Sequence, residues 1–176
     1  MSGAVALRAA TPADVPVAQA IEVAAGERFR TVDLHAIADD DPPSAEELLH
    51  HVGEGTAWVA TVDGAVVGYA IASVVDHEGH LDQVSLLPEH SGAGIGRALV
   101  ERVCRWAAEA GFEAVTLTTF RDVPWNGPLY AHLGFVEVPP DEQGPELAAV
   151  RAHERALGLD VAPRLAMRRP VADFVG

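Results

Sequence analysis

The segment that decides the fold of this chain reads Val84-Ser-Leu-Leu-Pro-Glu-His-Ser-Gly-Ala-Gly-Ile-Gly-Arg97. An apolar run stops at Pro88, three glycines alternate over the next positions, and a helical pattern begins directly after them. Glycines permit positive φ angles and let a ligand approach the backbone closely, and the N–H groups at a helix start attract anionic oxygens. The segment therefore predicts a strand, a loop that binds phosphate or pyrophosphate, and a helix.

This loop differs from the dinucleotide-binding fingerprint. The position where G-x-G-x-x-G requires its third glycine holds Arg97, and the preceding strand follows a hairpin instead of opening the chain. A glycine-rich turn without any ligand is the alternative interpretation.

The segments on either side have clear periodicities. Residues 95–110 place apolar side chains at three- and four-residue steps, which predicts an amphipathic helix that Gly111 ends. Earlier in the chain, the runs 57–62 and 65–75 are joined by Asp63-Gly64, a pair typical of a two-residue hairpin turn. A second turn, at residues 77–79, leads into a strand over residues 81–87.

The remaining elements complete an α+β pattern. Strands are predicted over residues 5–8, 114–119, 135–138 and 164–169, and helices after Thr11-Pro12 and over residues 44–52, 124–133 and 146–157. No repeat and no linker interrupts this order, so we expect a single domain over residues 1–176.

Composition excludes several functions. The chain has 176 residues with a net charge of −14, and its 12 basic residues are all Arg. Without lysine, neither a Walker-type phosphate loop nor a pyridoxal Schiff base can form. The acidic balance makes nucleic acid a poor partner. Because Cys104 is the only cysteine and no stretch suits a signal peptide or a membrane span, we expect a cytoplasmic protein without a membrane partner.

The glycine segment resembles the central motif of the GNAT superfamily of acyl-CoA-dependent N-acyltransferases, Q/R-x-x-G-x-G/A, with Ser91 at the position that usually holds Gln or Arg. The resemblance implies a mixed, mostly antiparallel central sheet with helices on both faces. It also implies that the strand backbone at Leu86 and Leu87 pairs with the pantetheine arm of acetyl-CoA. The residues that would meet its pyrophosphate are Ser91, Gly92, Ala93, Gly94, Ile95, Gly96 and Arg97.

A second segment, residues 123–135, resembles the later motif of the same family, an Asn followed by an aromatic residue and then Gly-Phe. By this resemblance Asn126 contacts the cofactor arm, and Tyr130 donates a proton to the departing thiolate. Two motifs in this order, separated by a helix and a strand, are more specific than either alone.

The general base has two candidates. An amine must be neutral to attack an acyl group, so a side chain has to accept the ammonium proton directly or through water. His80 and Asp82 are two residues apart on one strand and therefore share a face, where family members hold a Glu or His base. His80 suits the role by its ordinary pKa, and Asp82 could orient it or act through water. The alternative is that both residues cap the adjacent turn and face solvent.

Acceptor recognition is expected after the first helix. By the resemblance, Glu27 and Phe29 lie where the family builds its acceptor pocket, as do Glu22 and Arg28, and acidic residues there would suit a cationic amine. Trp125 could form a wall of the same site or pack in the core. His77 and His80 lie near a turn without a third ligand, so no metal is expected.

These observations predict an acetyl-CoA-dependent N-acetyltransferase that acts on a small-molecule amine by direct attack on the thioester. Two alternatives stay open: a catalytically degenerate module that senses acyl-CoA, and an enzyme that acetylates a peptide or protein. The resemblance also leaves a homodimer open.

Overall fold

The computed structural model describes residues 3–174. Within them residues 3–72 and 81–103 form one compact unit, and residues 73–80 and 104–174 form a second. Seven strands hydrogen-bond in the order β1-β2-β3-β4-β5-β7-β6. The pairs β1–β2, β2–β3, β5–β7 and β6–β7 are antiparallel, and β4–β5 is parallel. This mixed, mostly antiparallel sheet confirms the predicted fold class.

In the first unit, the strands form around the predicted hairpin. The strands are β1 (Val5–Ala9), β2 (Ala57–Val62), β3 (Ala65–Val75) and β4 (Glu78–Leu86), the last two continuing into the second unit. Val62 pairs with Ala65, and the two turn residues have φ of 49° at Asp63 and 85° at Gly64. These left-handed angles match the twist of an antiparallel hairpin, so the predicted turn is confirmed.

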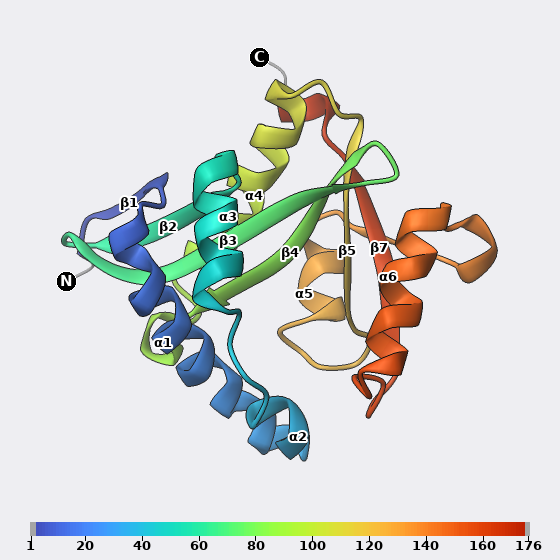
Figure 1. The fold of residues 1–176 in the computed structure, drawn as a ribbon, viewed down its shortest axis with the longest axis horizontal. Helices are drawn as coiled ribbons and strands as arrows, with labels where there is room; N and C mark the ends of the chain where they lie inside the picture. Colours follow the sequence, from blue (N-terminus) through green and yellow to red (C-terminus); the bar gives the residue numbers. More distant parts are fainter. Residues whose placement is uncertain (1–2, 175–176) are drawn as a thin grey trace. The chain divides into compact units, whose positions relative to one another are not determined.

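Helices cover both faces of the strands in this unit. The helices are α1 (Val15–Gly26), α2 (His35–Ala38), α3 (Ala45–Glu54) and the first part of α4 (Ile95–Glu109). Figure 1 shows α1 and α3 in front of β2 and β3, and their apolar side chains join those of Val59, Tyr69 and Ile71 in one core cluster. On the other face, the backbone of Gly68 approaches Leu86 and Leu99, the latter from α4.

The second unit is built around β7. It contains β5 (Ala114–Phe120), α5 (Gly127–His132), β6 (Val136–Val138), α6 (Pro145–Ala156) and β7 (Arg164–Pro170), with β7 between β5 and β6. Leu147 of α6 packs against Val75 and Ala166 in a second core cluster. Cys104 of α4 is fully buried, as expected for a packed apolar side chain.

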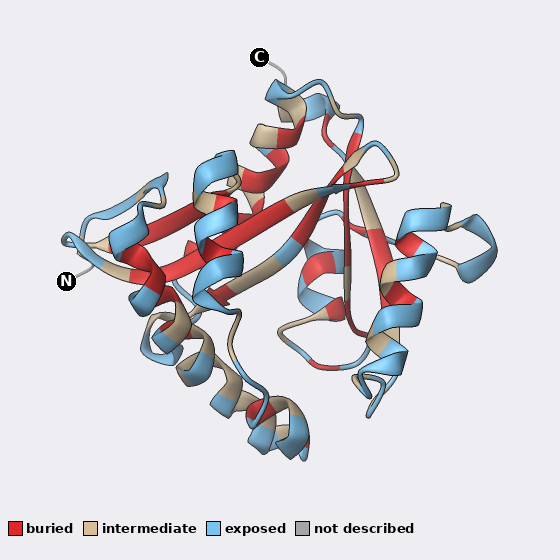
Figure 2. Cartoon of the chain, in the orientation of Figure 1, coloured by how far each residue is buried: buried red, intermediate tan, exposed pale blue. Residues whose placement is uncertain are grey.

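Burial follows these layers. Figure 2 shows β2, β3 and β5 as mainly buried, and α3 and α6 as exposed along their outer surfaces. No helix within residues 3–174 is long and apolar enough to cross a membrane.

Three predicted boundaries were wrong. The second turn is Asp76-His77, where φ is 52° and 61°, so β4 begins at Glu78 instead of residue 81. Helix α5 begins at Gly127 instead of residue 124, because the Asn126 N–H closes a turn onto Val123 O at 2.9 Å. The chain after α1 was read without a helix, yet it continues into a 3₁₀ helix (Glu27–Val32) and α2.

Asp76 joins the β3–β4 turn to the start of α6. Its carboxylate accepts from the N–H groups of Glu146 at 2.9 Å and Leu147 at 2.8 Å, while its own N–H donates to the Glu146 carboxylate at 2.8 Å. The first N–H groups of a helix have no partner within the helix, so this reciprocal contact satisfies donors that would otherwise be orphaned. A turn 70 residues earlier in the chain therefore caps α6.

We predict that Asp76→Ala lowers the free energy of unfolding by about 2 kcal/mol, because it removes the cap and places Ala at a positive φ. Asp76→Asn should cost less, since Asn tolerates that φ and keeps one acceptor oxygen. Urea denaturation measures both, with Asp141→Ala as an exposed acidic control in the same unit. Equal stability of wild type and Asp76→Ala would contradict the capping role.

Candidate active site

The glycine loop leaves its backbone open. Gly92 and Gly94 both have φ of 82°, and a Cβ built on Gly92, Gly94 or Gly96 would have no atom within 4 Å beyond its chain neighbours and the local helix backbone. Residues 91–94 are exposed. The Ala98 N–H donates to Gly94 O at 3.0 Å, so the N–H groups of residues 95–97 precede the first i→i−4 bond of α4. Several backbone donors therefore converge on accessible space, which fits a pyrophosphate.

The two side chains of the loop that were expected to meet the pyrophosphate contribute unequally. Ser91 is exposed, and its N–H donates to Pro88 O at 3.1 Å. The Arg97 guanidinium already pairs with Glu101 at 2.8 Å on the surface of α4. Backbone groups thus offer the loop's main donors, and Arg97 would have to exchange partners to contribute.

At the end of β4, the backbone groups of Leu86 and Leu87, the two residues assigned to the pantetheine arm, point in different directions. The Leu87 N–H donates to Val67 O at 2.8 Å, and Leu87 O accepts from His90 N at 2.9 Å. Because backbone groups alternate in direction along a strand, those of Leu86 point away from β3. Of the two residues, Leu86 is therefore the one whose N–H and C=O are directed toward an added strand-like ligand.

Asp82 lies beside a histidine that the sequence analysis did not select. Its carboxylate is 3.9 Å from Nε2 of His51 on α3, and Nδ1 of His51 is 2.9 Å from the Thr56 hydroxyl. Burial lowers the pKa of His51. The Asp82 side chain keeps 29% of its surface exposed, so water can reach the carboxylate.

The alternation of β4 breaks next to Asp82. Both Asp82 and Gln83 contact residues of the layer formed by α1 and α3, since Gln83 donates to Glu22 of α1. Leu86 instead contacts Gly68 on the face of α4. Two successive side chains on one face mark a local irregularity of the kind that re-aims side chains near sites.

His80 is buried, with 3% of its surface exposed. Its Nδ1 lies 2.8 Å from the hydroxyl of Thr116, which itself donates to Gly79 O at 3.5 Å. If the hydroxyl hydrogen is used in this way, Nδ1 of His80 acts as the donor to Thr116. Burial lowers the pKa of His80 to about 4, so the ring is neutral at pH 7. The alternative interpretation, that His80 faces solvent, was wrong.

The second motif places Asn126 and Tyr130 at the two ends of one helical turn. Asn126 is half-buried and precedes α5, where its side-chain amide donates to Trp125 O at 3.0 Å. Tyr130 is buried, its ring meets Phe135 edge-on at 5.8 Å, and no residue in 3–174 forms a hydrogen bond with its hydroxyl. Burial raises the pKa of Tyr130 well above the ordinary value, which keeps the phenol protonated.

The expected acceptor residues differ in charge balance. Glu27 is exposed and forms an ion pair with Arg30 at 2.9 Å, and Arg30 also pairs with Asp39 at 2.5 Å. Phe29 and Trp125 are half-buried. The negative charge of Glu27 is therefore already balanced within the protein.

Glu22 belongs to a polar cluster that the sequence analysis missed. Its carboxylate accepts from the Tyr69 hydroxyl at 2.8 Å, from the Gln83 amide at 2.7 Å and from the Ser85 hydroxyl. The cluster joins α1 to β3 and β4. The available signal was Gln83 and Ser85, two polar residues at alternate positions of the strand and therefore on one of its faces.

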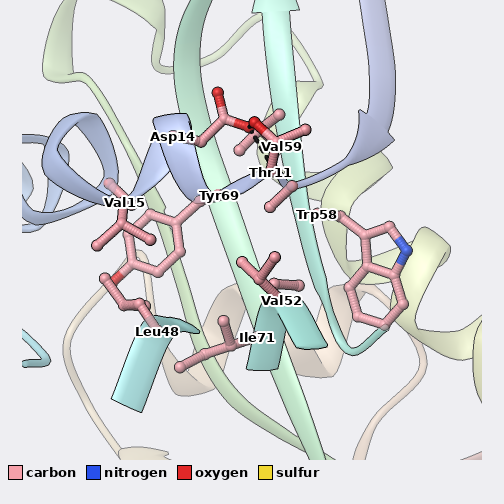
Figure 3. Close-up of a pocket in the computed structure, with 12 residues that line it drawn as sticks. Thr11, Asp14, Val15, Leu48, Val52, Trp58, Val59, Tyr69 and Ile71 are labelled. Carbon is pink, nitrogen blue, oxygen red and sulfur yellow. Dashed lines mark hydrogen bonds between the residues drawn. The ribbon is translucent and has the colours of Figure 1, made fainter. Parts of the chain in front are cut away.

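An apolar hollow between α1, α3, β2 and β3 includes the ring of Tyr69 in its lining. Figure 3 shows it bordered by Val15, Leu48 and Ile71, with Thr11 and Asp14 at one end. The Asp14 carboxylate is engaged by Arg8 at 2.7 Å and by the Thr11 N–H at 2.7 Å. Since its polar groups are already paired and no predicted site residue lines it, the hollow is a packing gap of the core.

The predicted site residues thus fall into two sets. The first unit holds the glycine loop, Leu86, Leu87, Asp82, Glu27 and Phe29, and the second unit holds His80, Trp125, Asn126 and Tyr130.

The comparison with protein families agrees with these features. Residues 27–135, more than half of the chain, match the model of the acetyltransferase (GNAT) family. The chain belongs to this family, and it is an N-acetyltransferase that uses coenzyme A as the acyl carrier.

Three solved structures illustrate the fold. A GNAT-family acetyltransferase from Staphylococcus aureus Mu50 has a TM-score of 0.73 at 14% identity, covering 96% of this chain and 99% of its own. The ribosomal-protein-S18-alanine N-acetyltransferase from Escherichia coli has 0.67 at 20% identity, covering 96% and 94%. N-acetylglutamate synthase from Neisseria gonorrhoeae, complexed with coenzyme A and N-acetyl-glutamate, has 0.69 at 17% identity and 97% coverage of this chain. The chain spans about a third of that synthase, since 36% of it is covered.

The buried His80 gives a prediction for stability. Its folded pKa of about 4 lies below the ordinary value of 6.5, so the unfolded chain binds more protons between these values and stability falls as the pH decreases through this range. The loss should reach about 3 kcal/mol. His80→Asn keeps a donor toward Thr116 and should remove most of this pH dependence. Urea melts from pH 7 to pH 4 measure it, and an equal dependence in both proteins would refute the assignment.

Proposed function

We propose that this chain transfers an acetyl group from acetyl-CoA to a small-molecule amine, by direct attack of the neutral amine on the thioester and without a covalent enzyme intermediate. Residues 1–176 would act as a single catalytic domain. Acetyl-CoA supplies an activated acyl carbon and a thiolate as leaving group.

Binding of the acyl carrier would rest on backbone groups. The N–H groups from Gly92 to Arg97 would hold the pyrophosphate, supported by the open space around the glycines. The backbone of Leu86 would pair with the pantetheine arm, and its N–H would polarise the thioester carbonyl where negative charge develops. Asn126 would contact the same arm with its side-chain amide.

Two residues remain candidates for accepting the proton of the ammonium group. His80 offers a neutral imidazole, but burial makes it a weak base, with a pKa of about 4. Asp82 is reached by water and lies beside His51, which supports a role through a water molecule. We propose Asp82 as the residue that receives the proton through water, and His80 as the neutral group that fixes the strand beside it.

The proposed catalytic mechanism also needs a proton donor for the departing thiolate, and Tyr130 is the candidate. Its ring is buried, and its hydroxyl is protonated and without a hydrogen-bond partner among residues 3–174. The hydroxyl oxygen is not among the fully buried side-chain atoms that lack a partner, so it reaches accessible space. A thiolate that forms next to it would accept its hydrogen, so we assign Tyr130 as the proton donor.

We predict that Tyr130→Phe lowers kcat and kcat/KM together by about 100-fold while the affinity for acetyl-CoA stays within about twofold. Phe keeps the ring that packs on Phe135, so the fold should not change. Steady-state kinetics and a separate titration with acetyl-CoA measure the two quantities.

The control is Thr61→Val, which removes a hydroxyl from a buried residue of β2 outside the proposed site. A Tyr130→Phe rate within twofold of wild type would remove Tyr130 from the mechanism. A parallel loss of rate and affinity would make it part of the acyl-CoA site instead.

Ser91 provides a test of the loop. We predict that Ser91→Arg tightens acetyl-CoA binding by about 0.5–1.5 kcal/mol, because a guanidinium adds charge-assisted bonds to the pyrophosphate at an exposed position. Calorimetric titration measures the change in affinity for acetyl-CoA. Ser44→Arg would not serve as a control, because Ser44 caps α3. Glu89→Gln, which removes one nearby negative charge, separates a general charge effect from a direct contact. If Ser91→Arg binds acetyl-CoA with unchanged affinity, the backbone of the loop alone binds the pyrophosphate.

A further inference from the structure

Glu22 has an unusual charge environment for an acidic side chain in this chain. Its three contacts are to neutral donors: the hydroxyls of Tyr69 and Ser85 and the amide of Gln83. Among residues 3–174, no Arg or His lies within ion-pair distance of its carboxylate. The negative charge of Glu22 is therefore not balanced by a protein cation.

Several other acidic residues, unlike Glu22, form ion pairs with arginines. Glu27 pairs with Arg30, and Glu78 pairs with Arg168 at 2.6 Å. Glu154, which is well buried, pairs with Arg151 and Arg164 at 2.8 and 3.0 Å. Arginines thus balance the carboxylates of Glu78 and Glu154, whereas neutral side-chain donors hold the carboxylate of Glu22 in place.

The carboxylate has room for one further donor. An ionised carboxylate offers about four acceptor positions. Oε2 accepts from Tyr69 and Ser85, and Oε1 accepts from Gln83 alone. One acceptor position remains on Oε1, and Glu22 is only half-buried, so a ligand in solution can reach it.

The cluster adjoins the strand that we assign to the acyl carrier. Ser85 directly precedes Leu86, and neighbouring strand residues are about 3.3 Å apart along the chain. A cation held by Glu22 would therefore lie beside the part of β4 where the proposed chemistry takes place.

We propose that Glu22 binds a positively charged group of the acceptor other than the nitrogen that is acetylated, so that the preferred substrates are diamines or related polycations. This inference rests on the proposed function. The nitrogen that attacks must lose its charge, whereas a fixed carboxylate with three donors gains most from a cation that keeps its charge. The net charge of −14 favours the approach of such a substrate.

Two acceptors of matched length test this proposal. In 1,4-diaminobutane both ends are amines, and in 4-amino-1-butanol one amine is replaced by a hydroxyl. Release of thiol from acetyl-CoA gives kcat/KM for each compound at pH 8. We expect wild type to prefer the diamine by about tenfold or more, as a charge-assisted contact would give. Glu22→Gln should lower this ratio by about tenfold, while the part of the ratio that comes from the unequal basicity of the two compounds stays the same in both proteins.

The matched control is Glu54→Gln, an exposed acid in the same unit. It removes the same charge without touching the cluster, so it should keep the preference of wild type. Glu22→Gln preserves volume, and the hydroxyls of Tyr69 and Ser85 can rotate to suit the amide, so the variant should fold. Circular dichroism checks this.

A preference that is absent in wild type, or one that is equally large in Glu22→Gln, would overturn the assignment of Glu22. If neither compound accepts an acetyl group, the proposed acetylation of small amines is wrong. The role of Glu22 is then tested separately, by binding of the diamine. In that case, we measure the melting temperature with coenzyme A and 1,4-diaminobutane present. The cation site is supported if the diamine raises the melting temperature of wild type and Glu54→Gln but not that of Glu22→Gln. It is overturned if the diamine raises none of the three melting temperatures, or raises all three equally.

Discussion

The left-handed backbone at Gly92 and Gly94 is the constraint on which the site depends. With φ of 82° at both positions, the chain leaves β4, turns in the exposed loop and starts α4 with its first N–H groups in accessible space. A residue with a Cβ would pay about 1–2 kcal/mol at each position. The same glycines keep side chains away from the loop, so an anionic ligand can approach the backbone itself.

This backbone solution suits a chain without lysine. Many phosphate sites use an ammonium group as a point charge, and this chain has none to offer. Its arginines are largely engaged in ion pairs, such as Arg97 with Glu101 and Arg168 with Glu78. Helix N–H groups and their dipole remain as the source of positive potential, and their direction is set by the fold.

Polar groups inside the two units serve different ends. Asp76 and Glu154 connect elements that are distant in sequence, because their oxygens satisfy donors of α6, β5 and β7. Burial keeps His80 and Tyr130 neutral, the first as an unprotonated imidazole and the second as a protonated phenol. Glu22 differs from Glu154, because neutral side-chain donors fix its position without balancing its charge.

The sequence by itself determined the features that local chemistry controls. Asp63-Gly64 specified the hairpin through its left-handed angles, the apolar periodicity of residues 95–110 specified α4, and the alternating glycines specified the loop between β4 and α4. The motifs around Gly94 and Tyr130 were sufficient for the family, because their residue types and order are independent of the details of packing.

Only the tertiary structure decided which charges are balanced and which groups are exposed. The sequence placed Glu22 and Glu27 together as acidic residues near one helix, and the fold paired Glu27 with Arg30 while turning Glu22 toward Tyr69. Likewise, His80 is an ordinary histidine in the sequence, and its neutral state follows from burial against Thr116 on a strand 36 residues away. Such properties depend on desolvation and on partners distant in the chain, and neither is encoded in a local pattern.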